Sequence, residues 1–327
     1  MNAPPSRHRY HFGPTRIDAH LPLPMLSPAA EGSRADIVLH LRPAVPAHAP
    51  VDGWLHHWQD RQGATTLSLA AHADGYRLRF PGLCDFLVDA DAAGIAIEPL
   101  EGLDRDTLEH LIVDQLLPRA LAHRGAFVAH ASAVLVDGSA VLFLGHSGWG
   151  KSTLASLLHG AGHRVLSDDC ALLTVTAASV TATATYPSLR LFDDSIDRMT
   201  DSAPATLPVA AYSQKRRLAL DIPDAGNAGH PVAAIFLLND PAMPAGDHDI
   251  SPIPPALACM ALVEHSFRLD LYSGRHTRLL LGQAAQVQRH VPVHALRYPR
   301  DYAATPALLD ILRSHLDGIR AAACSRA

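Results

Sequence analysis

One segment of nine residues, 145–153, constrains this chain more than any other part of it. It reads G-H-S-G-W-G-K-S-T and fits the phosphate-binding (Walker A) pattern G-x-x-x-x-G-K-[ST] at every fixed position. An apolar run over 140–144 leads into it as a buried strand, and residues 152–158 lead out as a helix. Strand, glycine-rich loop and helix in this order predict a nucleotide site in an α/β domain. The residues expected to line that site are Gly145, His146, Ser147, Gly148, Trp149, Gly150, Lys151, Ser152 and Thr153.

The fixed positions of this pattern each have a chemical reason. Glycines let successive backbone N–H groups surround a polyphosphate, and the N-terminus of the following helix adds partial positive charge. Lys151 is expected to reach the β- and γ-phosphates, and Ser152 to offer its hydroxyl to Mg²⁺. The loop therefore predicts a bound nucleotide together with Mg²⁺.

Lysine is almost absent from the chain, so the two positions that have it need an explanation. Of the 27 Lys and Arg residues, only Lys151 and Lys215 are lysines. For Lys151 the loop supplies the reason, because a compact ammonium suits a phosphate better than a planar guanidinium. Lys215 lies in the basic stretch 214–217 and has two interpretations: a solvated surface turn, or a second phosphate contact.

Composition and charge exclude several classes of protein. A net charge of −5 argues against a nucleic-acid binder, and no apolar run reaches the roughly 18 residues of a membrane span. Residues 1–10 lack the apolar core of a signal peptide, and the four cysteines form no C-x-x-C pair. The 21 histidines show no metal-ligand spacing and are interpreted as surface or core residues. We therefore expect a cytoplasmic protein with free thiols and without nucleic-acid or membrane partners.

The first third of the chain predicts a small β module followed by a helix. Residues 1–35 are rich in Pro, His and Ala and are expected to be irregular. Mainly antiparallel strands are predicted at 35–41, 65–69, 76–80, 86–89 and 94–97. The helix is expected to open with a capping box from Asp106 to Glu109, to kink or end at Pro118, and to stop by Gly125. We place the domain boundary at its start, which gives a mainly β module over 1–105 and a nucleotide-binding domain with C-terminal helices over 106–327.

The second domain is expected to place strands and helices around the loop. One strand over 128–136 turns at Asp137-Gly138 and returns over 139–144 into the loop, whose helix ends near 160–162. Further strands are predicted at 164–167, 171–176, 179–185, 215–221 and 232–238, and helices at 256–267, 277–290 and 307–322.

Three side chains outside the loop are candidates for catalysis. Asp168 and Asp169 follow a short strand, where one carboxylate can contact Mg²⁺ and the other can accept a hydroxyl proton. We assign the base to Asp168 and the metal to Asp169 with Ser152; the alternative is an Asp pair that only caps a turn. Pairing around the hairpin places His130 opposite a residue near Gly145 and hence close to the phosphates, unless it is a structural histidine.

In their order along the chain, these residues resemble the catalytic core of the HPr serine kinase/phosphorylase family. That core has a strand-borne His, a phosphate loop on a hairpin, a Gly-His segment and an Asp-Asp pair. The matching positions are His130, residues 145–153, Gly162-His163 and Asp168-Asp169, and the similarity spans about residues 125–240. The resemblance implies an α/β fold akin to phosphoenolpyruvate carboxykinase, a P-loop core with a mixed β-sheet. It also implies serine phosphorylation from ATP and Mg²⁺, with catalytic roles for Lys151, Asp168, Asp169 and His130.

The chain departs from the family's pattern at several positions. His146 stands where the family usually has Asp, Thr153 where it has an acidic residue, and Cys170 where it has Arg. The family's second signature, a Glu-x-Arg-Gly-type segment, has its nearest counterpart in 215–217. The chain is more similar to divergent HPr-kinase-like proteins found beside ribosomal-peptide pathways, some of which phosphorylate a serine of a lasso-peptide precursor.

We therefore expect a kinase that transfers the γ-phosphoryl group of ATP to a hydroxyl, that of a serine in a peptide or small protein. Two alternatives stay open: a small-molecule kinase of the same fold, and a non-catalytic protein that binds nucleotide to regulate a partner. No guanine-reading motif such as N-K-x-D occurs, so ATP is the default from the family. A homo-oligomer is compatible with the sequence, which does not indicate the number of subunits.

Overall fold

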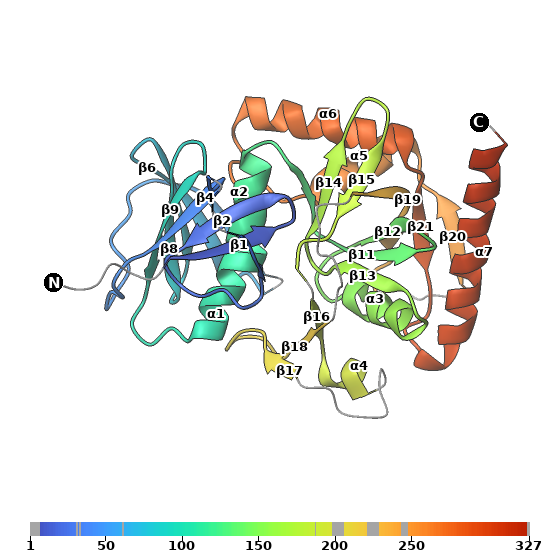
Figure 1. Ribbon diagram of the computed structural model, residues 1–327, viewed down its shortest axis with the longest axis horizontal. Coiled ribbons are helices and arrows are strands. Elements are labelled where there is room, and N and C mark those ends of the chain that lie inside the picture. The colour runs from blue at the N-terminus through green and yellow to red at the C-terminus, as the bar shows by residue number, and fades with distance from the viewer. Residues whose placement is uncertain are drawn as a thin grey trace. The chain divides into compact units, whose positions relative to one another are not determined.

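The computed structural model describes residues 7–30, 32, 34–60, 62–186, 188–197, 206–220, 229–242 and 248–325. The chain divides into two compact units of mixed α/β structure (Figure 1). The first unit comprises 1–124, 208–214 and 268–271, and the second comprises 125–207, 215–267 and 272–327.

A nine-stranded sheet builds the described part of the first unit, in the order β3-β1-β2-β4-β9-β8-β7-β6-β5. The pairs β2–β4 and β4–β9 are parallel, and the other neighbours are antiparallel. The strands are β1 His8–Phe12, β2 Thr15–Ala19, β3 Ser27–Pro28, β4 Ile37–Leu41, β5 Trp54–Gln59, β6 Thr65–His72, β7 Gly75–Phe80, β8 Cys84–Val88 and β9 Gly94–Pro99.

This sheet confirms the five predicted strands but corrects the expectation of an irregular lead-in over 1–35. Strands β1, β2 and β3 lie there, and residues 1–6 are outside the described part of the chain. Tyr10 and Phe12 alternate as buried residues of β1, and Gly13 has φ +56° in the turn to β2. The neighbouring polar residues His8, Arg9 and His11 obscured this alternation in the sequence. Strand β5 was not predicted either.

The helical segment after the sheet runs through Pro118 without ending there. Helix α1 (Arg105–His110) passes into a π-helical stretch, Leu111–Leu116, and then into α2 (Leu117–His123). The amide of Leu117 donates to the carbonyl of Ile112, five residues back. This wider turn accommodates Pro118, which has no N–H to donate and whose ring would clash with a regular α-helical turn.

Two details of this segment differ from the sequence prediction. Its cap is Asp104, whose carboxylate accepts the amide of Thr107 at 2.8 Å, and not Asp106. The whole segment belongs to the first unit, so the division falls between Arg124 and Gly125, whereas the sequence boundary was placed before the helix.

The second unit is built on a mixed sheet in the order β10-β14-β15-β19-β12-β11-β13, with β21 beside β19 and β20 beside β21. The pairs β12–β19 and β19–β21 are parallel. The sheet strands are β10 Phe127–Ala129, β11 Ala131–Val136, β12 Ser139–Leu144, β13 Arg164–Ser167, β14 Ala171–Val175, β15 Val180–Thr183, β19 His230–Leu238, β20 Asp249–Pro252 and β21 Val293–Arg297. The other elements are β16 Ser188–Leu191, β17 Thr206–Pro208, β18 Arg216–Ala219 and the helices α3 Lys151–Gly160, α4 Asp193–Asp197, α5 Pro255–Glu264, α6 Gly274–His290 and α7 Thr305–Cys324.

Helices cover both faces of this sheet (Figure 1). In β12, Ala140, Leu142 and Leu144 pack in one cluster with residues of α5 and α6. Val141 and Phe143 point the other way and pack in a second cluster with residues of α3 and α7. Side chains alternate along a strand, so a fully apolar strand is stable only where both faces of its sheet are covered by other elements. The second unit is accordingly a three-layer structure of helices, sheet and helices.

The predicted strand over 128–136 is wrong in one respect. It breaks at His130, so that β10 pairs with β14 while β11 pairs with β12 and β13. The hairpin turn is confirmed, with φ +46° at Asp137 and +83° at Gly138, the backbone geometry of a tight two-residue hairpin. The predicted strand over 215–221 is β18, and its last residue, Asp221, is outside the described residues. The elements β16, β17, β20, β21 and α4 were not predicted.

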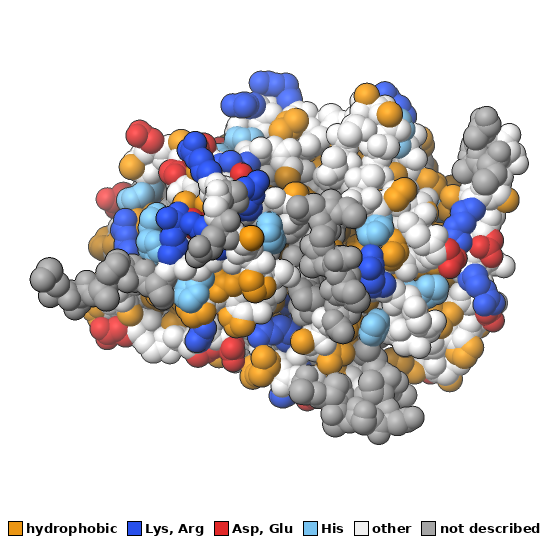
Figure 2. Space-filling model, viewed as in Figure 1, with side chains coloured by type: hydrophobic (Ala, Val, Ile, Leu, Met, Phe, Trp, Pro, Cys, Tyr) orange, Lys and Arg blue, Asp and Glu red, His pale blue; other side chains and the backbone are white. Residues whose placement is uncertain are grey.

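None of the helices in the described part of the chain is long and apolar enough to cross a bilayer. On the face drawn in Figure 2, basic and acidic side chains are intermingled over the first unit. This mixture agrees with a chain that carries 27 basic and 32 acidic residues.

Candidate functional site

The phosphate-loop sequence lies between a buried strand and a helix, as predicted. Strand β12 ends at Leu144, and α3 begins at Lys151 with Gly150 as its N-cap residue. Gly145 has φ +153°, and a Cβ there would lie 3.0 Å from the Trp149 ring. Gly150 has φ +90°, and a Cβ there would lie 3.1 Å from the Tyr298 hydroxyl. At both positions the backbone turns in a way that only glycine adopts without strain.

Replacing Gly150 by Ala is expected to distort the loop. The left-handed backbone costs a residue with a Cβ about 1 kcal/mol, and the contact with Tyr298 adds to it. We expect at least a tenfold loss of ATP affinity, measured by calorimetry. Gly160→Ala is the matched control, because a Cβ at this α3 position meets nothing within 4 Å; its affinity should equal that of the wild type. Equal affinities of all three proteins would contradict a role of the loop backbone in binding.

The side chain of Lys151 folds back into the phosphate loop. Its side chain is buried, and Nζ donates to the carbonyl of Gly145 at 2.8 Å and to that of His146 at 3.3 Å. Burial lowers the pKa of Lys151, whereas the charges of Asp169 and Asp168 act in the opposite direction. The ammonium therefore sits at the centre of the loop with carbonyl partners that an anionic ligand can replace.

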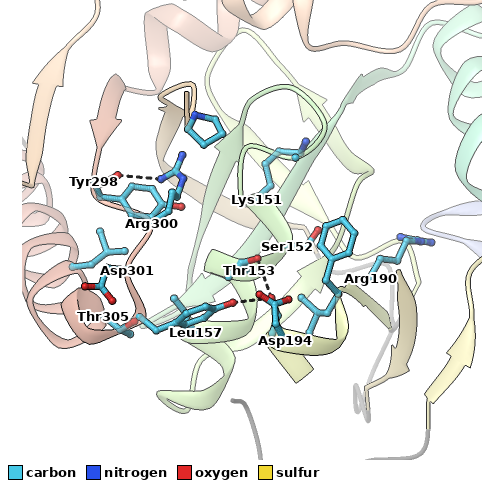
Figure 3. A pocket seen from close by; sticks show the side chains of 18 of the residues that line it. Lys151, Ser152, Thr153, Leu157, Arg190, Asp194, Tyr298, Arg300, Asp301 and Thr305 are labelled. Atoms are coloured by element: carbon cyan, nitrogen blue, oxygen red, sulfur yellow. Dashed lines mark hydrogen bonds between the residues drawn. The ribbon is translucent and has the colours of Figure 1, made fainter. Parts of the chain in front are cut away.

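A cavity of about 310 Å³ opens beside the loop (Figure 3). The loop and the start of α3 form one wall, residues 190–192, 194 and 195 of β16 and α4 a second, and residues 298–302, 304, 305 and 308 a third. Both lysines of the chain, Lys151 and Lys215, line this cavity. Lys215 also lies over the Phe192 ring at 5.6 Å. The structure thus favours the second interpretation of Lys215, a cation that faces the same space as the loop.

Asp168 lies behind the cavity and is completely buried. Its Oδ1 accepts the Ser132 hydroxyl at 2.5 Å and its Oδ2 accepts the backbone N–H of Arg190 at 2.9 Å. The backbone carbonyl of Asp168 accepts the Tyr186 hydroxyl at 2.6 Å and the Arg190 guanidinium at 3.2 Å. Burial and the neighbouring charge of Asp169 raise the pKa of Asp168. Because both of its carboxylate oxygens accept hydrogen bonds, the Asp168 side chain links β11 and β16 to the turn after β13.

Asp169 faces the cavity instead. Its backbone is in the left-handed region, with φ +62°, which turns its side chain away from that of Asp168. Its Oδ1 lies 3.5 Å from Nε2 of His130. Although burial raises the pKa of Asp169, the hydrogen bond from His130 and the charges of Lys215 and Lys151 outweigh it and hold this pKa well below the usual range. The Asp169 carboxylate is therefore an anion at neutral pH, beside the lysines.

His130 occupies the break between β10 and β11. Its backbone N–H donates to the carbonyl of His265 at 2.6 Å, and its ring lies 5.8 Å from that of Phe267. Burial and the charge of Lys151 lower the pKa of His130, although Asp169 acts in the opposite direction. The hairpin register pairs Ala131 with Leu144, so His130 lies beside the loop as the sequence predicted.

The remaining loop residues divide between the cavity and its outer side. Ser147, Gly148, Ser152 and Thr153 line the cavity, and the Thr153 hydroxyl lies 3.5 Å from that of Ser195. Trp149 and His146 contact each other edge to face, with ring centroids 4.7 Å apart. His146 is half exposed and is not part of the cavity wall.

Sequence reasoning missed Arg190, Tyr298 and Arg300. Arg300 donates to the carbonyls of Trp149 at 2.9 Å and Asn239 at 2.8 Å, and its guanidinium lies 3.7 Å from the centre of the Tyr298 ring. These contacts connect Trp149 of the loop to the segment after β19 and to Tyr298. Residues 298–300 follow β21 as 145–150 follow β12, and these strands run parallel and end at the same edge of the sheet, but β21 was not predicted from the sequence.

The donors present fit Mg²⁺ chemically. Ser152 and Asp169 both face the cavity, and hydroxyl and carboxylate oxygens are the ligands that Mg²⁺ takes together with phosphate oxygens and water. The backbone N–H groups of the loop and the Lys151 ammonium fit a polyphosphate.

Comparisons with known proteins found matches among solved structures. No protein-family model and no curated protein matches the chain. Among solved structures, the Hpr(Ser) kinase/phosphatase from Coxiella burnetii matches over 59% of this chain and 98% of that chain, with 15% sequence identity and a TM-score of 0.31.

Proposed function

We propose that this protein is an ATP- and Mg²⁺-dependent kinase that transfers the γ-phosphoryl group to a serine hydroxyl of a peptide or small protein. One observation carries the proposal: the glycine-rich loop, its buried lysine and Asp169 all line one cavity, and Asp169 lies 3.5 Å from His130. Phosphoryl transfer needs a phosphate cradle, cations and a carboxylate near the acceptor, and each is present there.

The loop and its lysine would bind and orient the nucleotide. Backbone N–H groups of 145–150 surround the phosphates, and the Lys151 ammonium neutralises charge that develops on the γ-phosphoryl group. Ser152 and Asp169 would hold Mg²⁺, which would supply further charge neutralisation. Lys215, which also lines the cavity, would add a second cation.

The roles that we propose for Asp168 and Asp169 differ from those assigned from the sequence. Because Asp168 is buried with both oxygens engaged, we propose a positioning role for it. Asp169 would be the carboxylate that faces the acceptor hydroxyl and accepts its proton, with His130 holding its orientation from 3.5 Å. The low pKa of Asp169 keeps its carboxylate ionised at neutral pH.

The proposed acceptor, fold family and location follow from the resemblance of the motifs. A serine in a peptide or small protein suits a site whose third wall is partly aromatic and apolar. We also propose an HPr-kinase-like P-loop core akin to phosphoenolpyruvate carboxykinase in the second unit, which begins at Gly125, and a cytoplasmic protein.

The test is transfer from γ-labelled ATP with Mg²⁺ to peptides encoded next to the gene. We expect labelled phosphoserine with the wild type and about 100-fold less with Lys151→Ala, because a buried cation at the phosphates is lost. Arg313→Ala removes an exposed cation outside the cavity and should label at the wild-type rate. Tight Mg²⁺-dependent ATP binding without transfer to any peptide would instead indicate a small-molecule acceptor or a regulatory nucleotide-binding protein.

A further inference from the structure

A second group of chemically active side chains lies outside the cavity. His146, Glu264 and His265 bring one potential ligand atom each to within 4.8 Å of one another. Nε2 of His146 lies 3.2 Å from Oε1 of Glu264, and the rings of His146 and His265 are 4.9 Å apart. The sequence does not bring these residues together, because His146 follows β12 whereas the other two end α5.

We infer that His146, Glu264 and His265 form a binding site for a transition-metal ion of the Zn²⁺ class. Two imidazole nitrogens and one carboxylate oxygen are a typical set of three protein ligands for Zn²⁺, with the fourth position left to water or another ligand. The candidate Mg²⁺ ligands, Ser152 and Asp169, offer only oxygen atoms. The two sites therefore select different ions, since imidazole favours Zn²⁺ and its neighbours whereas hydroxyl and carboxylate favour Mg²⁺.

The geometry lets these ligands close around an ion. Tetrahedral ligands at about 2.1 Å from Zn²⁺ lie about 3.4 Å apart, so the group must contract from its present spacing. His265 is the fixed member, because its side chain is buried at the end of α5. The side chains of His146 and Glu264 are 49% and 59% exposed, so rotation about their own bonds can bring them to the ion without moving the backbone.

The position of this site gives a bound ion a structural consequence. His146 follows Gly145, and the carbonyls of both residues accept Lys151 Nζ. The carbonyl of His265 accepts the backbone N–H of His130. An ion held by His146 and His265 would therefore fasten the first residues of the loop to the end of α5, next to the break in the strand that carries His130.

The experiment measures metal binding by the full chain without an affinity tag and without nucleotide. Protein freed of metal is titrated with Zn²⁺ in competition with a coloured chelator, and separately with Co²⁺, whose visible absorption reports tetrahedral nitrogen and oxygen ligands. The variants are His146→Ala and Glu264→Gln, both at exposed side chains. His290→Ala removes an exposed histidine at the end of α6 and is the matched control.

We expect one Zn²⁺ per wild-type chain, a tetrahedral Co²⁺ spectrum, and at least a tenfold loss of affinity in both variants but not in His290→Ala. Circular dichroism must show the same fold in all four proteins; for a variant that fails this check, the surviving variant decides. No stoichiometric Zn²⁺ in the wild type, or the same affinity in all four proteins, would overturn the proposal and leave His146 and Glu264 as a surface ion pair. Because no nucleotide or acceptor is used, this result is independent of kinase activity.

Discussion

Replacing Asp169 by Asn should reduce phosphoryl transfer by on the order of 10³-fold, the typical contribution of a positioned carboxylate base. The side chain keeps its size, so the cavity keeps its shape, but the amide cannot take the acceptor's proton and is a weaker ligand for Mg²⁺. Nucleotide affinity in the absence of Mg²⁺ should stay the same or rise, because an anion facing the phosphates is removed. Single-turnover transfer from γ-labelled ATP and calorimetric titration of ATP measure the two effects separately.

Asp193→Asn is the control for this experiment. Asp193 begins α4 beside the cavity wall without lining the cavity, and its side chain is 74% exposed, so its neutralisation should change transfer by less than a few fold. Transfer that survives Asp169→Asn but is lost in Asp168→Asn, at an unchanged melting temperature, would return the base to Asp168.

Replacing Asp168 by Ala should mainly destabilise the second unit. The Ser132 hydroxyl and the Arg190 amide would lose their acceptors inside the protein, and the Arg190 guanidinium would lose a neighbouring negative charge. Each buried donor left without a partner costs about 1–3 kcal/mol, so we expect a loss of about 3 kcal/mol and a melting temperature lower by roughly 10 °C. Thermal unfolding followed by circular dichroism measures this effect.

Ser167→Ala is the matched control at the preceding residue. The Ser167 hydroxyl is buried and has no hydrogen-bond partner among the described residues, so its removal should be neutral or slightly stabilising. A melting temperature of Asp168→Ala equal to that of the wild type would refute the positioning role and imply that Asp168 contributes only to the reaction.

The separate roles of Asp168 and Asp169 could not be predicted from the sequence. Two adjacent aspartates after a strand predicted a functional pair, but adjacent residues can face opposite sides of a turn. The left-handed backbone of Asp169, with φ +62°, sends one carboxylate to the cavity and leaves the other among Ser132 and Arg190. Arg190 lies on β16, a strand that the sequence did not predict, so no pattern available beforehand distinguished the two roles.

The grouping of the histidines could not be predicted from the sequence either. Their spacing along the chain gave no metal-ligand pattern, and they were interpreted as surface or core residues. His146 and His265 meet only because the end of α5 packs against the loop that follows β12. Ligands that come from distant segments leave no local spacing to detect.

The sequence by itself determined the local chemistry: the strand, glycine-rich loop and helix of 140–158, the tight turn at Asp137-Gly138, and the need for a lysine at position 151. These features depend on neighbouring residues, whose backbone preferences and side-chain period are readable along the chain. Only the tertiary structure decided which side chains share the cavity, because Lys215, Arg190 and residues 298–300 reach it from strands whose order in the sheets has no local sequence signal. Strand order is set by long-range packing of apolar faces, so the partners of the loop emerge only when the sheet is assembled.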